Sequence, residues 1–471
     1  MNDRKCIFIL ADGARADLFE YLLSRGDLPN ISRYIVDRGS YVNGVSVFPS
    51  TTGPAYLPYL LGKFPGRCNL PGIRWFDRKE YGTRKFSLNR FRSYIGLETY
   101  LINSDIHSSG VPTLFELFPD SVSILNEITR GINSSGDRTR FRKIYYKMKS
   151  HFTGGCDEVD EASGRILLNS LRSSPDLIFA VFMGVDTYSH QLHPYHKSVI
   201  DSYTRIDKYI GLAGDYLRRE GKLDDTLIIL GSDHGLTSTH THFDSLGFLR
   251  KFGYKPLYYP NIFRHLLNAD ASNMVSGNSM AHMYFKNDSG WHEPTNIEEI
   301  ENIVDDLVSR EEVDMVMGVD EDKNIVIRSE SGEARTRMED GKIRFDVVSG
   351  NPLGMNLESG IYDPYEQLVR TFDTKYPDVL LQIIQLFESA RTGDIVISAG
   401  RGYDLRAGHE SPEHRSSHGS LDRDHIMVPL AINKPVLRKF VRTVDIYPTI
   451  VKFLGKEIPE NIDGIDLLDN V

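Results

Sequence analysis

Cysteine is scarce in this chain, and long apolar runs are missing from it. Only three cysteines occur among 471 residues, and no two of them form a Cys-x-x-Cys pair. So few cysteines give no disulfide framework and favour a reducing compartment. No apolar stretch approaches the roughly 20 residues of a transmembrane helix, and the run from Cys6 to Ala11 is too short for a signal peptide. We therefore expect a cytoplasmic protein with no transmembrane segment.

An excess of positive charge is also absent. Lys and Arg total 55 against 65 Asp and Glu, which gives a formal net charge of −10. Because no basic stripe dominates, a nucleic-acid polymer is not an expected partner. A small anionic substrate remains compatible with this charge, since bound metal ions would set the local field. The sequence does not indicate an oligomeric state.

Short apolar segments alternate with helical patterns through the first half of the chain, without internal repeats or low-complexity linkers. This alternation is typical of an α/β fold with a mostly parallel central sheet flanked by helices on both faces. The patterns predict strands over 6–10, 40–47, 121–125, 177–183 and 226–230, and helices over 53–61, 157–171 and 195–219.

The pattern changes in the second half of the chain. From Val313 to Asp346 it consists of short strands with charged turns, which predicts a β-rich accessory insertion. The α/β pattern then resumes, with a strand predicted over 394–398. We therefore expect residues 1–311 and 376–471 to form one discontinuous α/β catalytic core, and residues 312–375 to form a β-rich accessory or cap segment.

Aspartates closely follow three of the predicted strands: Asp12, Asp186 and Asp233. In open α/β sheets, ligands bind just beyond the carboxyl ends of the strands. Any one of these aspartates alone would more often be a helix cap or a turn residue. Three carboxylates at one edge would repel each other strongly unless a cation lay among them. Their shared position therefore predicts a metal site.

Histidines accompany two of these aspartates. His234 directly follows the third aspartate in a Ser-Asp-His-Gly segment, and His190 lies four residues after Asp186. On a helical turn, residues four apart share one face, so Asp186 and His190 can bind the same ion. His193 and His196 are rivals, but their spacing from Asp186 is less favourable.

His418 is a further candidate ligand. It lies in the polar, turn-rich segment Ser-Ser-His-Gly-Ser, where small neighbours leave its imidazole room for an ion. His409 and His414 are rivals for this role, and an ordinary loop histidine is the plainer interpretation.

A hydroxyl nucleophile is suggested by the segment Phe-Pro-Ser-Thr-Thr-Gly-Pro, residues 48–54, which leads into a predicted helix. Backbone N–H groups at a helix N-terminus favour phosphate oxygens, and a metal ion would make a hydroxyl there more nucleophilic. The alternative is a plain N-cap, a position that Ser and Thr prefer. The residues alone do not choose among Ser50, Thr51 and Thr52.

These segments, in this order, resemble the alkaline phosphatase superfamily, and within it the branch of type I phosphodiesterases and nucleotide pyrophosphatases. The resemblance runs from Ile7 to the C-terminus and is weakest between residues 241 and 399. It implies an alkaline-phosphatase-like fold. The motifs that carry it are Asp12-Gly at a strand end, Phe-Pro-x-x-Thr52, Asp186-x-x-x-His190, Ser-Asp233-His234-Gly and His418-Gly.

The resemblance also implies a two-metal mechanism. Thr52 would attack phosphorus and form a phosphothreonine intermediate, which water then hydrolyses, in two in-line displacements. Two zinc ions are the expected cofactors, although manganese or iron would also suit the ligands. One ion would be held by Asp12, Thr52, Asp233 and His234, and the other by Asp186, His190 and His418.

One position departs from the family pattern. Diesterases of this branch carry an asparagine after the nucleophile that holds a phosphoryl oxygen, and Ile73 stands at that position here. Arg74 is a candidate substitute through a charged contact, with an ion pair to Asp77 as its alternative role. Arg130 is a second candidate. An arginine clamp would favour a more highly charged phosphate, such as a monoester.

The predicted activity is hydrolysis of a small-molecule or lipid phosphate ester, at a phosphodiester or pyrophosphate bond. A phosphomonoesterase acting on a lipid or sugar phosphate, or a phosphotransferase, would use the same site. A non-catalytic binding protein is disfavoured, because all seven ligand positions carry metal-competent residues. A sulfatase is excluded, since the segment at Ser50 lacks the Cys/Ser-x-Pro-x-Arg pattern.

An aromatic-rich segment is a candidate apolar leaving-group site, although a small satellite core is the favoured interpretation. Its residues would be Tyr254, Leu257, Tyr258, Tyr259 and Phe263.

Overall fold

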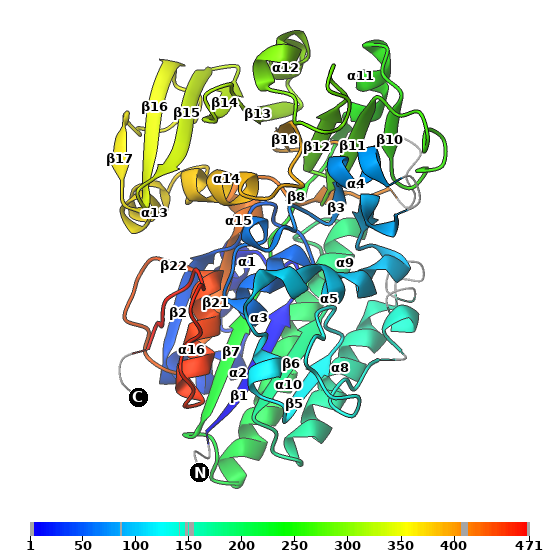
Figure 1. The fold of residues 1–471 in the computed structure, drawn as a ribbon. Helices are drawn as coiled ribbons and strands as arrows, with labels where there is room; N and C mark the ends of the chain where they lie inside the picture. Colours follow the sequence, from blue (N-terminus) through cyan, green and yellow to red (C-terminus); the bar gives the residue numbers. More distant parts are fainter. Residues whose placement is uncertain are drawn as a thin grey trace.

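Two large β-sheets organise the chain, one of seven strands and one of nine. The computed structural model describes residues 4–84, 87–140, 142–146, 149, 155–406 and 413–468. Figure 1 shows the seven-stranded sheet at the end of the molecule that holds both termini, and the nine-stranded sheet at the opposite end.

The seven-stranded central sheet has the strand order β22-β2-β21-β7-β1-β6-β5. β1 runs parallel to its neighbours β6 and β7, whereas β21 runs antiparallel to β7 and β2. The other pairs are parallel, so the predicted α/β fold with a mostly parallel sheet is confirmed. The strands are β1 (Lys5–Ala11), β2 (Ser40–Val45), β5 (Ser121–Ile124), β6 (Leu177–Phe182), β7 (Thr226–Gly231), β21 (Met427–Ile432) and β22 (Val441–Arg442).

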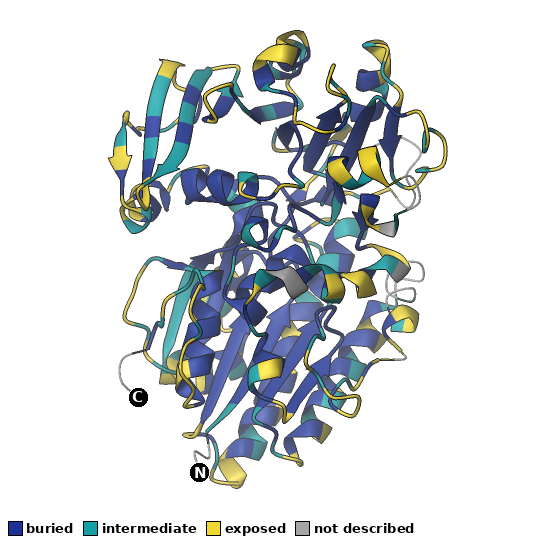
Figure 2. Cartoon of the chain, viewed as in Figure 1, coloured by how far each residue is buried: buried dark blue, intermediate teal, exposed yellow. Residues whose placement is uncertain are grey.

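Helices cover both faces of the central sheet, because its strands are apolar on both sides. The Phe8 ring lies 4.8 Å from Tyr59 of α3 on one face, and Phe182 lies 6.2 Å from Tyr209 of α10 on the other. Figure 2 shows the strands between these layers as buried. α16 packs with α3, and α2 and α8 pack with α10. These helices are α2 (Pro29–Tyr34), α3 (Leu57–Leu61), α8 (Cys156–Leu171), α10 (Lys197–Arg219) and α16 (Ile446–Phe453).

The nine-stranded second sheet has the order β10-β11-β12-β18-β13-β14-β15-β16-β17. Apart from the parallel pair β10 and β11, its neighbours run antiparallel. Its strands are β10 (Pro256–Tyr258), β11 (Ala271–Ser276), β12 (Met280–Phe285), β13 (Val313–Val319), β14 (Ile325–Ser329), β15 (Gly332–Glu339), β16 (Lys342–Gly350), β17 (Gly360–Tyr362) and β18 (Ile395–Ala399).

The second sheet draws on more of the chain than the predicted accessory segment 312–375. β10, β11 and β12 precede that segment, and β18 follows it. The strand predicted over 394–398 was assigned to the central core, yet β18 pairs with β12 and β13. An apolar run predicts a strand but not its partner, because pairing is decided by contacts distant in sequence. The division into a core of 1–311 and 376–471 and a cap of 312–375 stays a prediction.

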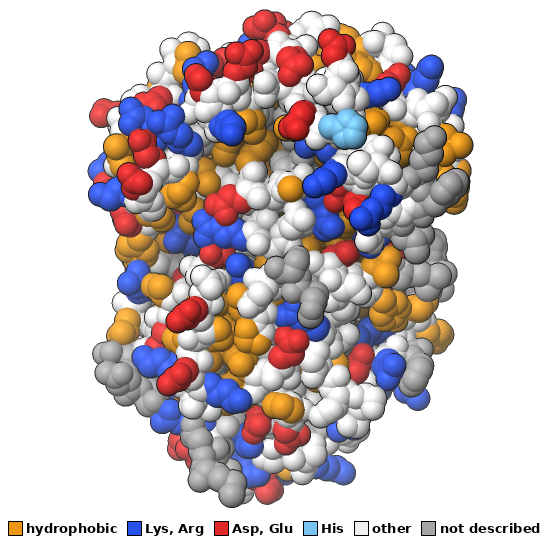
Figure 3. Space-filling view, in the orientation of Figure 1, with side chains coloured by type: hydrophobic (Ala, Val, Ile, Leu, Met, Phe, Trp, Pro, Cys, Tyr) orange, Lys and Arg blue, Asp and Glu red, His pale blue; other side chains and the backbone are white. Residues whose placement is uncertain are grey.

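Surface charges of both signs are interspersed on the face shown in Figure 3. Within the described residues, no helix is both long enough and apolar enough to cross a membrane.

Candidate metal centre

The three predicted aspartates lie at the carboxyl edge of the central sheet. Asp12 directly follows β1, and Asp233 lies two residues after β7. Asp186 lies in the first turn of α9 (Gly184–Gln191), which follows β6. β1, β6 and β7 are parallel neighbours, so their carboxyl ends meet at one edge. Asp12 and Asp233 are both buried there.

Hydrogen bonds tie the turn after β7 to the end of β1. Ser232 Oγ accepts from the Ala14 N–H at 2.8 Å and donates to the His234 carbonyl at 2.9 Å. The Gly13 N–H donates to Asp233 Oδ1 at 3.1 Å. Asp233 and His234 are therefore fixed beside the first aspartate.

Thr52 brings its hydroxyl to the same place. It lies just before the 3-10 turn η2 (Pro54–Tyr56), which leads into α3, so the helix predicted over 53–61 begins in 3-10 geometry. Thr52 Oγ1 lies 3.2 Å from His234 Nε2 and 3.4 Å from Asp12 Oδ1. Tyr56 donates to Asp12 Oδ2 at 3.0 Å, which holds that carboxylate in place.

The distances among these atoms fit ligands of a shared cation better than direct hydrogen bonds. His234 Nε2 lies 3.7 Å from Asp12 Oδ1 and 3.3 Å from Asp233 Oδ2. Good hydrogen bonds to oxygen are shorter, about 2.7–3.0 Å. Donors held about 2.0–2.1 Å from a tetrahedral zinc ion lie about 3.3–3.5 Å apart. The spacing around Thr52 is therefore close to that of a metal site.

A second group of candidate ligands adjoins the first. His190 Nε2 lies 3.3 Å from Asp186 Oδ1 on α9, as the four-residue spacing predicts. The ring of His418 stacks on His234 with centroids 3.8 Å apart, and lies 5.1 Å from His190. Ligand atoms of Asp186, His190 and His418 lie within 4.8 Å of one another, and so do those of Asp12, Asp186 and His234. Asp186 belongs to both groups, so the two groups are adjacent.

All three histidines present Nε2 to the cluster. A carbonyl oxygen only accepts, so the hydrogen-bond geometry assigns the proton to Nδ1 and leaves the Nε2 lone pair for a metal. Burial and the neighbouring His234 and His190 lower the pKa of His418, which favours its neutral, ligating form. The Nδ1 contacts are His190 to the Ser416 carbonyl at 2.7 Å, His234 to that of Gly235 at 3.1 Å, and His418 to that of Ser50 at 2.8 Å.

The electrostatics of the cluster call for a cation. Burial raises the pKa of Asp12 well above its usual value, and the charges of Asp233 and Asp186 raise it further. Burial also raises the pKa of Asp233. Asp233 Oδ2 and Asp186 Oδ1 are buried without a hydrogen-bond partner among the described residues. Buried carboxylates are costly unless a compensating charge is near, so the residues present fit divalent metal ions.

Two of the rival histidines have other contacts, whereas a third, His414, lies beside His190. His193 and His196 lie against each other, 5.4 Å between ring centroids, and His196 caps α10. His414 packs against His190 with centroids 4.3 Å apart, and His409 lies outside the described residues.

Among the three adjacent hydroxyl residues, Thr52 alone contacts the metal-ligand candidates through its side-chain oxygen. Ser50 Oγ donates to the Ser420 carbonyl at 3.3 Å and accepts from the Gly419 N–H at 3.1 Å. Thr51 Oγ1 is buried and has no hydrogen-bond partner among the described residues.

Arg130 makes its contacts away from the seven candidate ligands. Arg130 donates to Glu116 Oε2 at 2.9 Å and to the carbonyls of Ile106 and Val111 at 2.8 and 2.5 Å. The structure therefore uses Arg130 to hold neighbouring loops together, and does not bring it to the cluster. A basic residue after a strand signals no particular partner, because its long side chain can turn to any nearby acceptor.

Arg74, in β3 (Arg74–Phe76), lies over the Tyr259 ring at 5.8 Å, and its Nε donates to Ser93 Oγ at 3.4 Å. Asp77, its suggested ion-pair partner, instead pairs with Arg391 at 3.1 Å. Ile73 is partly buried and packs on the main hydrophobic core, as its side chain requires.

One part of the site was not predicted. The turn between β11 and β12 of the second sheet reaches the cluster: the His418 N–H donates to the Gly277 carbonyl at 2.9 Å, and the Ser279 N–H to the His418 carbonyl at 3.0 Å. A Cβ on Gly277, where φ is +62°, would lie only 2.7 Å from His418 Nδ1. The Gly-Asn pair signals a hairpin turn, but nothing local signals its distant partner.

The aromatic segment mostly forms local core. Leu257 and Tyr258 are buried, and Tyr254 packs edge-on against a strand phenylalanine of the second sheet. Tyr259 donates to Glu98, so it too is engaged locally. Phe263 differs, because 78% of its surface is exposed.

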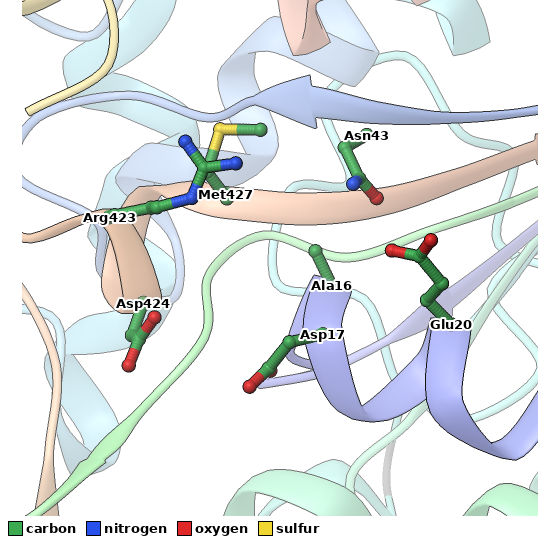
Figure 4. Close-up of a pocket in the computed structure, with 7 residues that line it drawn as sticks. All are labelled: Ala16, Asp17, Glu20, Asn43, Arg423, Asp424 and Met427. Atoms are coloured by element: carbon green, nitrogen blue, oxygen red, sulfur yellow. The ribbon is translucent and has the colours of Figure 1, made fainter. Parts of the chain in front are cut away.

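The structure contains a cavity of about 100 Å³, whose lining residues are shown in Figure 4. Arg15 pairs with two of its carboxylates, Asp17 at 2.8 Å and Asp424 at 2.9 Å. The lining of the cavity includes none of the predicted site residues. The cavity lies among α1 (Ala16–Ser24), β2 and α15 (Arg423–Ile426), and its lining consists of Ala16, Asp17, Glu20, Asn43, Arg423, Asp424 and Met427.

Solved structures of other proteins share this fold. The phosphonoacetate hydrolase of Sinorhizobium meliloti 1021, in complex with phosphonoacetate, is 15% identical over 96% of each chain, with a TM-score of 0.54. Murine ectonucleotide pyrophosphatase/phosphodiesterase 5 is 14% identical over 98% of each chain, with a TM-score of 0.56. An inactive threonine-to-alanine form of the murine protein, in complex with AMP, gives a TM-score of 0.56 at 14% identity, over 98% of this chain and 97% of that chain.

At such identities these structures show the fold alone, and a comparison with curated proteins found no match. The sequence profile described as type I phosphodiesterase / nucleotide pyrophosphatase matches residues 6–421, which is most of the chain. The chain therefore belongs to the type I phosphodiesterase / nucleotide pyrophosphatase family and is a hydrolase of phosphoester bonds.

Proposed function

We propose that this protein hydrolyses phosphodiester or pyrophosphate bonds through Thr52, with two zinc ions bound at the site. The observation that carries the proposal is the position of Thr52 Oγ1, 3.2 Å from His234 Nε2 and 3.4 Å from Asp12 Oδ1. The related structures hold AMP, a phosphate ester, and phosphonoacetate, a phosphonate, which supports a small-molecule substrate, and a lipid phosphate ester is the alternative. Ile73 stands where diesterases of this branch carry an asparagine. A phosphomonoesterase is therefore the second candidate function.

The donor set supports zinc, with manganese or iron as alternatives. When bound, two such ions supply positive charge that lowers the pKa of the Thr52 hydroxyl and stabilises the phosphoryl oxygens. One ion would be held by Asp12, Thr52, Asp233 and His234, and the other by Asp186, His190 and His418.

The chain's own residues prepare Thr52 for attack. Its Oγ1 forms a bond to phosphorus as the bond to the leaving oxygen breaks, and Thr52 then carries the phosphoryl group. Water attacks the same phosphorus, releases the product and restores the hydroxyl. Tyr56 holds Asp12, and the Gly13 N–H holds Asp233, so the polar atoms around Thr52 need little rearrangement during the reaction.

The test compares zinc-loaded with metal-free protein on bis-p-nitrophenyl phosphate and p-nitrophenyl phosphate. We expect about two zinc ions per chain by elemental analysis, turnover that favours the diester, and at least a roughly 100-fold loss when the metal is removed. Activity should return when zinc is added back. A protein that binds two zinc ions but hydrolyses neither ester would contradict the proposal and favour a binding role.

Replacing Arg130 by methionine should lower the stability of the protein without weakening substrate binding. The change removes an ion pair and hydrogen bonds to two carbonyls, which contribute about 1–3 kcal/mol in such partly buried positions. Thermal unfolding should show a lower melting temperature, while KM for the diester stays within about twofold. A large rise in KM would instead show that the guanidinium reaches the substrate.

A cytoplasmic location is part of the proposal. Cys6, Cys68 and Cys156 are buried and unpaired, which supports a reducing compartment.

A further inference from the structure

His425 lies between two of the segments that carry the candidate ligands. It belongs to α15, the short helix that follows the loop of His418, and only 2% of its surface is exposed. Its carbonyl accepts from the Gly235 N–H at 2.8 Å. A Cβ on Gly235 would lie only 2.1 Å from the Asp424 carbonyl oxygen, so a glycine is needed here for the turn after His234 to pack directly on α15.

The imidazole of His425 joins the same two segments through its two nitrogens. Nδ1 accepts from the Ser420 N–H at 3.3 Å and lies 2.8 Å from Ser420 Oγ, whereas Nε2 lies 2.7 Å from Thr237 Oγ1. Burial lowers the pKa of His425 to about 3, so the ring is neutral. A nitrogen that accepts from a backbone N–H carries no proton, so Nε2 holds the proton and donates to Thr237.

Ser50 ties the nucleophile segment to the same network. Its Oγ donates to the Ser420 carbonyl at 3.3 Å, and its carbonyl accepts from His418 Nδ1 at 2.8 Å. Ser420 is therefore bound by Ser50 on one side and by His425 on the other. Thr52 lies two residues after Ser50. Three segments thus meet through one buried chain of hydrogen bonds: the nucleophile segment, the loop of His418 and the turn after β7.

This network fixes how the two groups of candidate ligands lie relative to each other. His418 belongs to one group and His234 to the other, and their rings stack with centroids 3.8 Å apart. His425 binds both the loop after His418 and the turn after His234, so a shift of one segment against the other would break its hydrogen bonds. Each broken bond would leave a buried polar group without a partner, which is unfavourable.

We propose that His425 is a positioning residue, which holds the two ligand-bearing segments at the separation that a pair of metal ions requires. The proposal rests on the proposed two-metal hydrolysis at Thr52. His425 takes no part in the bond changes of the reaction. It acts through Ser420 on one segment, and through Gly235 and Thr237 on the other.

Zinc titration of the metal-free protein, in competition with a chromophoric chelator, tests this role without turnover. His425→Ala should bind at least one of the two zinc ions about tenfold more weakly than the wild type, because groups that orient metal ligands have effects of this size. His425→Asn keeps an acceptor for Ser420, loses the donor to Thr237, and should show a smaller loss. In the cobalt-loaded proteins the visible absorption band depends on coordination geometry, so it should differ between His425→Ala and the wild type.

A double-mutant cycle shows whether the contact runs through the imidazole. Thr237→Val removes the hydroxyl that Nε2 contacts and keeps the size of the side chain. It should weaken zinc binding several-fold in the wild-type background and have no further effect in His425→Ala. Equal effects in both backgrounds would show that Thr237 acts independently of His425 and would contradict the proposal. Should His425→Ala fail to fold, unchanged zinc affinity in both Thr237→Val and His425→Asn would overturn it.

His282→Ala is the matched control. His282 is likewise a buried histidine whose ring nitrogens hold backbone groups: Nε2 donates to the Pro71 carbonyl at 2.9 Å, and Nδ1 accepts from the Gly393 N–H at 3.2 Å. Its loss should lower the melting temperature but leave the zinc affinity within about twofold. A similar loss of zinc affinity in both variants, or no loss in a folded His425→Ala, would overturn the role of His425.

Activity gives a second measurement. With zinc in excess, kcat for bis-p-nitrophenyl phosphate should fall about tenfold in His425→Ala while KM changes less than about threefold, because the ligands remain but their alignment is altered. A wild-type protein that binds two zinc ions but turns over no ester would contradict the proposed function, and the zinc titration would still decide about His425. A wild-type protein that binds no divalent metal would overturn both.

Discussion

Thr52→Ala is expected to lower kcat by about 1,000-fold or more while the fold is retained. The variant lacks the only hydroxyl of residues 50–52 that contacts His234 and Asp12, so no group remains to form the bond to phosphorus. The loss should appear in kcat rather than in KM, because the metal ions still bind the phosphoryl group. Steady-state rates on bis-p-nitrophenyl phosphate, with circular dichroism and zinc content as checks, would measure it.

Two matched variants sharpen this prediction. Thr51→Ala removes the neighbouring hydroxyl, which is buried and has no hydrogen-bond partner among the described residues, and should keep activity within about tenfold. Thr52→Ser keeps a hydroxyl and should retain measurable turnover. Full activity of Thr52→Ala, or its loss in Thr51→Ala alone, would show that the nucleophile is assigned to the wrong residue.

Asp233→Asn is expected to stabilise the metal-free protein and to inactivate the enzyme. The wild-type carboxylate is buried near Asp12, and its Oδ2 has no hydrogen-bond partner in the part of the chain that the structure describes. In the variant, the amide oxygen can still accept from the Gly13 N–H, and the new N–H can donate to His234 Nε2. We expect a gain of about 1–3 kcal/mol without metal, and a loss of activity of about 100-fold or more with it.

The stability difference between the metal-free Asp233→Asn variant and the wild type should depend on pH. Burial raises the pKa of Asp233 in the folded protein, so the metal-free folded state binds that proton more tightly than the unfolded state. The resulting stability is present below the unfolded pKa of about 4 and is lost as pH rises through the folded pKa. Asparagine has no such proton, so the advantage of the variant should grow over this pH range.

Melting temperatures of both metal-free proteins between about pH 4 and pH 8 would measure the difference. Asp176→Asn, which removes a partly exposed carboxylate paired with Lys5, is the control and should show no comparable gain. A metal-free Asp233→Asn protein that melts below the wild type would contradict the argument that these carboxylates are arranged for a cation.

Local patterns predicted which residues the structure brings together at the candidate site. Asp12 and Asp233 each follow an apolar strand, and parallel neighbouring strands must end at the same edge. Asp186 and His190 are four residues apart, so one turn of helix brings them together whatever surrounds it. Such patterns are short-range and depend on backbone periodicity, which the order of residues dictates directly.

Partners distant along the chain were decided by packing. The sequence does not specify which acceptors Arg130 contacts. In the tertiary structure it donates to Glu116 and to two backbone carbonyls. The strand over 394–398 joined β12 and β13 because its apolar faces match that sheet, which its own sequence does not specify. The contact of Gly277 with His418 likewise depends on where the second sheet docks.

The sequence by itself thus determined the α/β core and predicted the candidate ligands, since both follow from residue type and local periodicity. Only the tertiary structure placed Thr52, and not Thr51 or Ser50, against His234 and Asp12 by direct contact. It also brought His425 into contact with Gly235 and Thr237, which lie far away in the chain. The physical reason is that long-range neighbours are selected by the packing of whole elements, so residues next to each other in sequence, such as Thr51 and Thr52, can face entirely different surroundings.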